Sequence, residues 1–205
     1  NTGRKRVLSK AKRIVVKLGT NVVMKDNTFN QPFIADLAKE ISALRRQGKE
    51  FIIVTSGAIG LGLEKLNLNN IGLSVIMQQT AASIGQNLLM HKYETIFSKF
   101  NQPIAQMLLT QENFEDRNVL KNPKHTLDKL LSLNVVPILN ENDAIAFEEL
   151  AMKKHFSDND ALAALVAKNI AADLLIICTD VDGLYTSNPA DEKAYSSALT
   201  QGVAE

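Results

Sequence analysis

The sequence alternates short apolar runs, rich in β-branched residues, with longer amphipathic stretches. We expect strands at residues 13–18, 51–55, 104–109, 135–139 and 174–179. Helical periodicity predicts helices at residues 33–47, 57–66, 75–100, 126–133 and 160–170. Strands that are apolar almost throughout are typical of a parallel sheet with helices on both faces. The pattern therefore predicts an α/β fold, a three-layer αβα sandwich with a mostly parallel central sheet.

Composition excludes several classes of protein. Lys and Arg number 23 against 22 Asp and Glu, and a formal charge of +1 provides no general attraction for nucleic acid or anionic lipid. No apolar run approaches the roughly 20 residues that span a bilayer, and the N-terminus lacks an apolar signal region. The single cysteine, Cys178, excludes an intramolecular disulfide framework and is expected as a small core side chain. We therefore expect a cytoplasmic protein with neither nucleic acid nor membrane as partner.

The only basic block lies at the N-terminus, from Arg4 to Arg13. A solvated arm over residues 1–12 is the simpler interpretation, and a binding patch is the alternative. Residues 13–205 contain no internal repeat, low-complexity segment or linker rich in Pro and Gly. They are expected to form one domain.

In sheets of this kind, ligands bind at the carboxyl ends of the strands. The first strand leads into Lys17-Leu18-Gly19-Thr20-Asn21. A lysine within an apolar run needs an anionic partner when it is buried, and glycine lets backbone N–H groups approach a phosphate. A lysine at a frayed strand edge, with its stem along the surface, is an equally open interpretation. The G-x-x-x-x-G-K-[ST] motif of a P-loop does not occur.

Small residues follow the second strand, from Thr55-Ser56-Gly57-Ala58 to Gly62. At a turn from strand to helix they leave the first N–H groups of the helix exposed, which favours an anion. The glycine order is not that of the dinucleotide fingerprint, and Ser56 does not lie in a nucleophile elbow. The three histidines show no relay pattern, which argues against nucleophilic hydrolysis.

Two clusters of acids and amides follow, at residues 140–143 (Asn-Glu-Asn-Asp) and 157–160 (Ser-Asp-Asn-Asp). Each could simply form a turn or a helix cap. The second cluster lacks the Gly at the sixth position and the Glu at the twelfth position of a calcium-binding EF-hand loop, and a zinc site would need cysteine or histidine ligands. A further acid, Asp180, follows Thr179 at the end of the last strand. Together, a cation, a glycine-rich anion cradle and several carboxylates and amides fit a kinase for a small molecule that carries both charges.

Seven motifs extend this hypothesis, and they occur in the order "VVKLGTNVV", "VTSGAIGLG", "AASIGQNLLMHKYETIF", "AQMLLT", "VVPILNENDAIA", "SDNDALAALVA" and "DLLIICTDVDGLYTSNP". In this order they resemble the glutamate 5-kinases, or γ-glutamyl kinases, of the amino-acid kinase family. The resemblance covers residues 13–189. It implies transfer of the γ-phosphoryl group of ATP, with Mg²⁺, to the side-chain carboxylate of L-glutamate, which yields L-glutamyl 5-phosphate for proline synthesis.

The resemblance also implies roles for individual residues. Lys17 would meet the transferring phosphoryl group, and Asp158 or Asp160 would orient this lysine, so Lys17 and Asp158 are the candidate catalytic residues. The glutamate pocket would be formed by Ser56, Gly57, Ala58, Asn140, Asp143, Asn159 and Asp160, with Asp143 holding the α-ammonium group. The nucleotide would contact Lys17, Gly19, Thr20, Thr179 and Asp180. No residue of the chain is identified as a metal ligand.

One feature of the family is missing. Its members carry a glycine-rich G-T-G-G-M stretch and a lysine that grip the nucleotide phosphates, whereas no such stretch follows Pro189 here. The kinase domain over 13–205 is therefore expected to be incomplete in its C-terminal part. The alternatives are a non-catalytic module that binds an amino acid, or a kinase for acetylglutamate, aspartate or carbamate. The resemblance further implies homo-oligomers and feedback inhibition by proline.

Overall fold

The computed structural model describes residues 8–69, 72–110, 117–145 and 159–180. Five strands form its main sheet: β1 (Arg13–Leu18), β4 (Glu50–Val54), β5 (Ile104–Leu109), β6 (Val136–Glu141) and β7 (Leu174–Cys178). Their order is β5-β6-β4-β1-β7, and every neighbouring pair is parallel. In this order β1 lies between β4 and β7, with Lys17 opposite Val54 on one side and Ile177 on the other.

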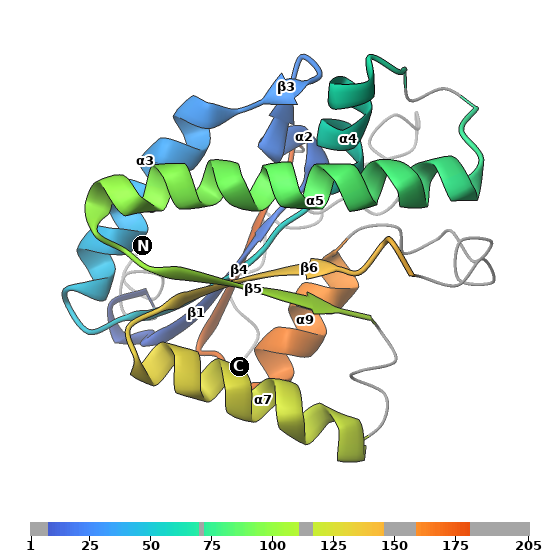
Figure 1. The fold of residues 1–205 in the computed structure, drawn as a ribbon. Helices are drawn as coiled ribbons and strands as arrows, with labels where there is room; N and C mark the ends of the chain where they lie inside the picture. The colour runs from blue at the N-terminus through green and yellow to red at the C-terminus, as the bar shows by residue number, and fades with distance from the viewer. Residues whose placement is uncertain (1–7, 70–71, 111–116, 146–158, 181–205) are drawn as a thin grey trace, which may run out of the picture.

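Helices cover both faces of this sheet. In Figure 1, α3 (Gln31–Arg45) and α5 (Val75–Phe97) lie on one side, and α7 (Arg117–Ser132) and α9 (Asp160–Asn169) on the other. Neighbouring residues of β1 belong to different cores, because Val16 packs beneath α3 and α5 while Val15 packs beneath α7 and α9. Since successive residues of a strand face opposite sides of the sheet, both odd and even positions must be apolar when both sides are buried. The predicted three-layer αβα sandwich is confirmed.

Three small elements lie between β1 and α3. A single helical turn, α2 (Thr20–Val23), is followed by an antiparallel pair, β2 (Met24–Lys25) and β3 (Thr28–Phe29). The chain then reaches α4 (Ala58–Leu66) after β4, and the 3₁₀ turn η1 (Ser98–Phe100) follows α5. Cys178, expected in the core, is half-buried and packs against the core beneath α3 and α5.

The first described residues lie against the domain. Ala11 is buried in the core, and the ammonium group of Lys49 donates to the backbone carbonyls of Leu8, Ser9 and Ala11. The backbone N–H of Lys12 donates to the Asp173 carboxylate. Residues 8–12 thus contact the domain through these hydrogen bonds and Ala11, while 8–10 and 12 stay exposed to solvent. Residues 1–7 of the expected arm lie outside the described residues.

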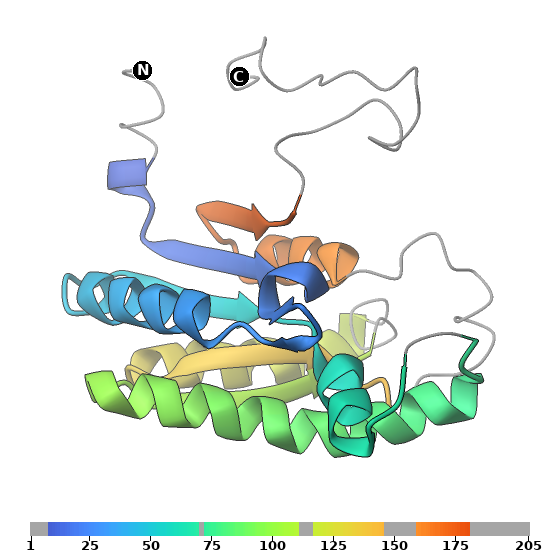
Figure 2. The ribbon, with the colours of Figure 1, turned by 90° about the horizontal axis from the view of Figure 1, so that it is seen from above.

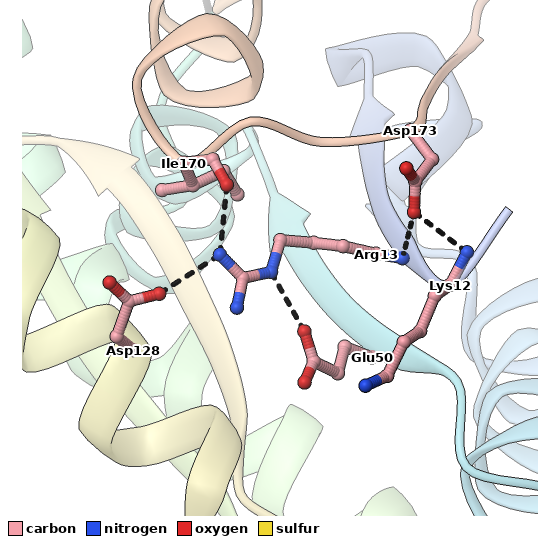
Figure 3. A network of polar contacts seen from close by, with 6 residues as sticks. All are labelled: Lys12, Arg13, Glu50, Asp128, Ile170 and Asp173. Atoms are coloured by element: carbon pink, nitrogen blue, oxygen red, sulfur yellow. Dashed lines mark hydrogen bonds and ion pairs between the residues drawn. The ribbon is translucent and has the colours of Figure 1, made fainter.

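Arg13 joins several elements at the opposite end of the sheet from the strand carboxyl ends (Figure 3). Its Nε lies 2.7 Å from Glu50 Oε2 on β4, and its Nη1 lies 2.9 Å from Asp128 Oδ1 on α7. The same Nη1 donates to the Ile170 carbonyl after α9, at 2.8 Å. Its backbone N–H donates to Asp173. One guanidinium group thus connects the start of the sheet to both helices of one face.

We expect Arg13→Met to lower the free energy of unfolding by roughly 1–3 kcal/mol, because three contacts of a part-exposed guanidinium are lost together. Urea unfolding followed by circular dichroism measures this difference. Arg46→Met removes an exposed guanidinium at the end of α3 and should change stability by less than about 0.5 kcal/mol. Equal values for the two variants would show that the Arg13 contacts add nothing to stability.

Candidate active site

Four strands of the sheet deliver polar residues to the same edge. The arrows of the sheet in Figure 2 run toward the end of the molecule where α2 and α4 lie. Parallel strands place their carboxyl ends together, so the segments that follow β1, β4, β6 and β7 are neighbours in space although they are far apart in the sequence. The candidate site is built from these segments and from the start of α9.

Lys17 is the buried cation of the site. Its side chain is 1% exposed, and its Nζ lies 2.8 Å from Oδ1 of Asp160, whose side chain is 51% exposed. Asp160 is the first residue of α9, where the helix dipole favours a negative charge. Of the two open interpretations of Lys17, the structure therefore supports the buried lysine with an anionic partner. Asp160 is the acid that meets it, and Asp158 lies outside the described residues.

Glycine closes the turn beside this ion pair. The N–H of Gly19 donates to the Cys178 carbonyl at 3.1 Å, which holds the end of β1 against the end of β7. A Cβ at Gly19 would lie 3.4 Å from both that carbonyl oxygen and Lys17 Nζ, so a side chain would fill the space next to the ammonium group. Thr20 follows as the exposed first residue of α2.

Asp180 lies on the same side of the site, after β7. Asn21 Nδ2 donates to Asp180 Oδ2 at 2.7 Å, and Thr179 Oγ1 donates to Asp180 Oδ1 at 3.3 Å. The hydrogen bond from Asn21 is the main reason why the pKa of Asp180 lies below its ordinary value, and the positive charge of Lys17 acts in the same direction. An ionised carboxylate therefore lies within electrostatic reach of the lysine, and its partner Asn21 belongs to the segment after the first strand but had no role assigned from the sequence.

The two clusters of acids and amides meet in the structure. Asn140 is the second-last residue of β6 and Asn159 precedes α9, and both are buried. Asn159 Nδ2 lies 2.9 Å from Asn140 Oδ1 and 3.0 Å from Ser56 Oγ, and it also donates to the Thr55 carbonyl. One carboxamide thus joins the exits of β4 and β6 to the start of the helix that carries Asp160.

The turn after β4 depends on a glycine. Gly57 has φ +103°, in the left-handed region that disfavours residues with a Cβ, and α4 begins directly after it at Ala58. A Cβ at Gly57 would also lie 2.9 Å from Val23 Cγ1. Thr55, two residues earlier, shares a 2.8 Å hydrogen bond with the hydroxyl of the fully buried Tyr93 on α5. The turn is therefore held from α2 and from α5.

A cavity of about 380 Å³ adjoins this cluster. It is bordered by Ala58 at the start of α4, by Ser83 and Gln86 of α5, and by Asn142 and Asp143 after β6. Burial, with a smaller contribution from the negative charge of Glu141, raises the pKa of Asp143 to about 6. At neutral pH the cavity therefore carries a negative charge that lacks full solvation and would be stabilised by a cation.

The predicted residues fall into three neighbouring groups. The first contains Lys17, Gly19, Asp160, Thr179 and Asp180, the second Ser56, Asn140 and Asn159, and the third Ala58 and Asp143 at the cavity. Consecutive residues join the groups: Asn159 to Asp160, and Ser56 through Gly57 to Ala58. Sequence reasoning assigned no role to Gln86, which lies within the motif AASIGQNLLMHKYETIF but resembles any polar residue on an amphipathic helix.

Two features, a cluster of metal-binding side chains and a membrane-spanning helix, are not found among the described residues. Among them, no three His, Cys, Asp or Glu side chains group closely enough to hold a metal ion. None of the helices in that part of the chain combines the length and the apolar character needed to cross a membrane.

Comparisons with known proteins agree with this geometry. The profile of the Amino acid kinase family matches residues 12–199. Glutamate 5-kinase of Geobacter sulfurreducens is 44% identical over 184 residues, which are 89% of this chain and 48% of that protein. The glutamate 5-kinases of Listeria monocytogenes and Enterococcus faecalis are 45% and 44% identical over 90% and 91% of this chain, and over 67% and 69% of their own lengths. The chain thus spans between about half and about two thirds of these relatives.

Proposed function

The chain belongs to the amino acid kinase family, and we propose that its protein transfers the γ-phosphoryl group of ATP to the side-chain carboxylate of L-glutamate, the first step of proline biosynthesis. The observation that carries the proposal is the ion pair of buried Lys17 with Asp160, next to the carboxamide cluster and the acidic cavity. The relatives named glutamate 5-kinase support this choice of substrate.

For this reaction the protein needs mainly to position the two substrates and to neutralise negative charge on the transferring group. The side-chain carboxylate of glutamate is already ionised at neutral pH, so no general base is needed. One of its oxygens attacks the γ-phosphorus, the bond from that phosphorus to the β,γ-bridging oxygen breaks, and ADP leaves with the electron pair. Lys17 would neutralise charge on the transferring group, while Asp160 keeps its ammonium group in place.

The remaining residues divide between the two substrates. Asn140, Asn159 and Ser56 would hold glutamate, with Asp143 facing its α-ammonium group. Gly19, Thr20, Thr179 and Asp180 would contact the nucleotide on the other side of Lys17. Mg²⁺ bound with ATP would supply further charge neutralisation at the phosphates, and the exposed, ionised Asp180 is a suitable oxygen ligand for it. A cytoplasmic location, expected from the composition, stays a prediction, and so do the homo-oligomers and the inhibition by proline that the resemblance implies.

The direct test uses the full-length protein with glutamate, Mg·ATP and hydroxylamine, which traps an acyl phosphate as a hydroxamate. We expect hydroxamate that depends on both substrates. N-acetylglutamate, aspartate and carbamate, assayed in parallel by ADP release, identify any other preferred acceptor. If the protein forms ADP with none of these acceptors and binds glutamate, it is a non-catalytic amino-acid-binding module.

We expect glutamate use to depend on the ionisation of Asp143. With a pKa of about 6, roughly a quarter of the Asp143 carboxyls are ionised at pH 5.5 and nearly all at pH 7.5. Only the ionised form attracts the ammonium group, so kcat/KM for glutamate should fall roughly three- to fourfold from pH 7.5 to pH 5.5 at saturating ATP. Asp143→Asn should lower kcat/KM at pH 7.5 and remove most of this dependence. An unchanged pH profile in Asp143→Asn would assign the titration to another group.

A further inference from the structure

Gln86 lies on α5, on the border of the cavity that also contains Asp143. Its Oε1 accepts a hydrogen bond of 2.8 Å from Asn140 Nδ2. The partner of this glutamine is thus one of the buried carboxamides that join the strand ends. Gln86 therefore connects α5 to the centre of the candidate site.

The orientation of both carboxamides follows from a backbone group. The N–H of Glu141 can only donate, and it points at Asn140 Oδ1 from 3.0 Å, which fixes that atom as the oxygen. Asn140 Nδ2 is then the atom that faces Gln86, and it requires an acceptor there. The atom of Gln86 that meets Asn140 must be Oε1, so Nε2 is the atom left over.

That second atom has no hydrogen-bond partner. Gln86 Nε2 is buried and is one of the few such atoms among the residues that the structure describes. A buried donor without an acceptor is unfavourable, and the great majority of buried polar groups avoid this state. An acceptor that enters the cavity would relieve this state after a small adjustment of the side chain.

We propose that Gln86 is a substrate-binding residue whose Nε2 donates to the α-carboxylate of the bound amino acid; this inference rests on the proposed function. Asp143 borders the same cavity and attracts the α-ammonium group, which places the α-carboxylate, two bonds away, in the same space. The side-chain carboxylate points instead toward Lys17. Gln86 thereby favours acceptors that carry a free α-carboxylate over simple carboxylic acids.

Two variants of the full-length protein separate this contact from a merely structural role. Gln86→Glu keeps an acceptor for Asn140 but replaces the donor with a negative oxygen, whereas Gln86→Met removes both groups at similar volume. If Gln86 contacts the substrate directly, Gln86→Glu should lower glutamate affinity most, by roughly ten- to a hundredfold. Gln86→Met should lower it about tenfold. A role limited to holding Asn140 predicts the reverse order, with Gln86→Glu close to the wild type.

Calorimetry with glutamate, and separately with a non-hydrolysable ATP analogue, provides the measurement. Nucleotide affinity should stay within threefold in both variants. Gln47→Glu, the same change in the exposed turn after α3, should leave glutamate affinity unchanged. If Gln86→Glu binds glutamate within threefold of the wild type, the inference is wrong. If Gln86→Glu does not fold, Gln86→Met decides, and normal glutamate binding by that variant also overturns the inference. A wild-type protein that binds nucleotide but no glutamate refutes the proposed function itself.

Discussion

Lys17→Met is expected to reduce kcat for glutamate phosphorylation by roughly 10²- to 10³-fold. The side chain is buried beside the carboxylate of Asp160, and we propose it as the cation that meets the transferring phosphoryl group. Methionine fills a similar volume without the charge. Hydroxamate formation by the full-length protein measures the loss, and calorimetry with glutamate shows whether binding of the amino acid survives.

The fold should tolerate this substitution. Asp160 is half-exposed, so water can solvate its carboxylate once the lysine is gone, and we expect a stability change under about 2 kcal/mol. Lys168→Met, at an exposed position in the last turn of α9, is the matched control and should keep full activity. Activity of Lys17→Met within tenfold of the wild type, in a folded protein, would remove Lys17 from the reaction.

Gly85→Ala should lower the free energy of unfolding by about 3 kcal/mol, the upper end of the usual cost of overpacking. A Cβ at Gly85 on α5 would lie 1.7 Å from the carbonyl oxygen of Ala58 and 2.5 Å from the backbone N of Gly62, both on α4. Backbone atoms cannot rotate away as a side chain can, so the two helices would have to separate. Because Ala58 borders the cavity, the KM for glutamate should rise as well.

Gly60→Ala provides the comparison within α4. Its Cβ would lie 3.3 Å from Cγ of Met24, a flexible side chain that can move, and alanine favours a helix over glycine by about 1 kcal/mol. We expect its stability within about 1 kcal/mol of the wild type, measured by urea unfolding. If both variants were equally stable, the close contact of α4 and α5 would not be a constraint on the fold.

Local sequence determined the main elements. The apolar runs at 13–18 and 104–109 are β1 and β5, with the bounds expected. β1 is buried inside the sheet, which requires apolar residues in succession, whereas β5 is an edge strand and only partly buried. The elements from Thr20 to Phe29 were missed, since runs of two to four residues show no periodicity. Helix α7 begins at Arg117, nine residues before the predicted start at Thr126, although it contains Pro123, a residue type that normally disfavours a helix interior.

The sequence by itself determined the fold class and which residue types stand at the strand ends, because periodicity and turn chemistry are properties of neighbouring residues. Only the tertiary structure decided their partners. Lys17 meets Asp160, and Asn140 meets both Asn159 and Gln86, because β1 lies next to β7 and β4 next to β6, and because α5 packs over that edge. Contacts across 19 to 143 positions depend on the order in which strands pair, and no local pattern contains that order.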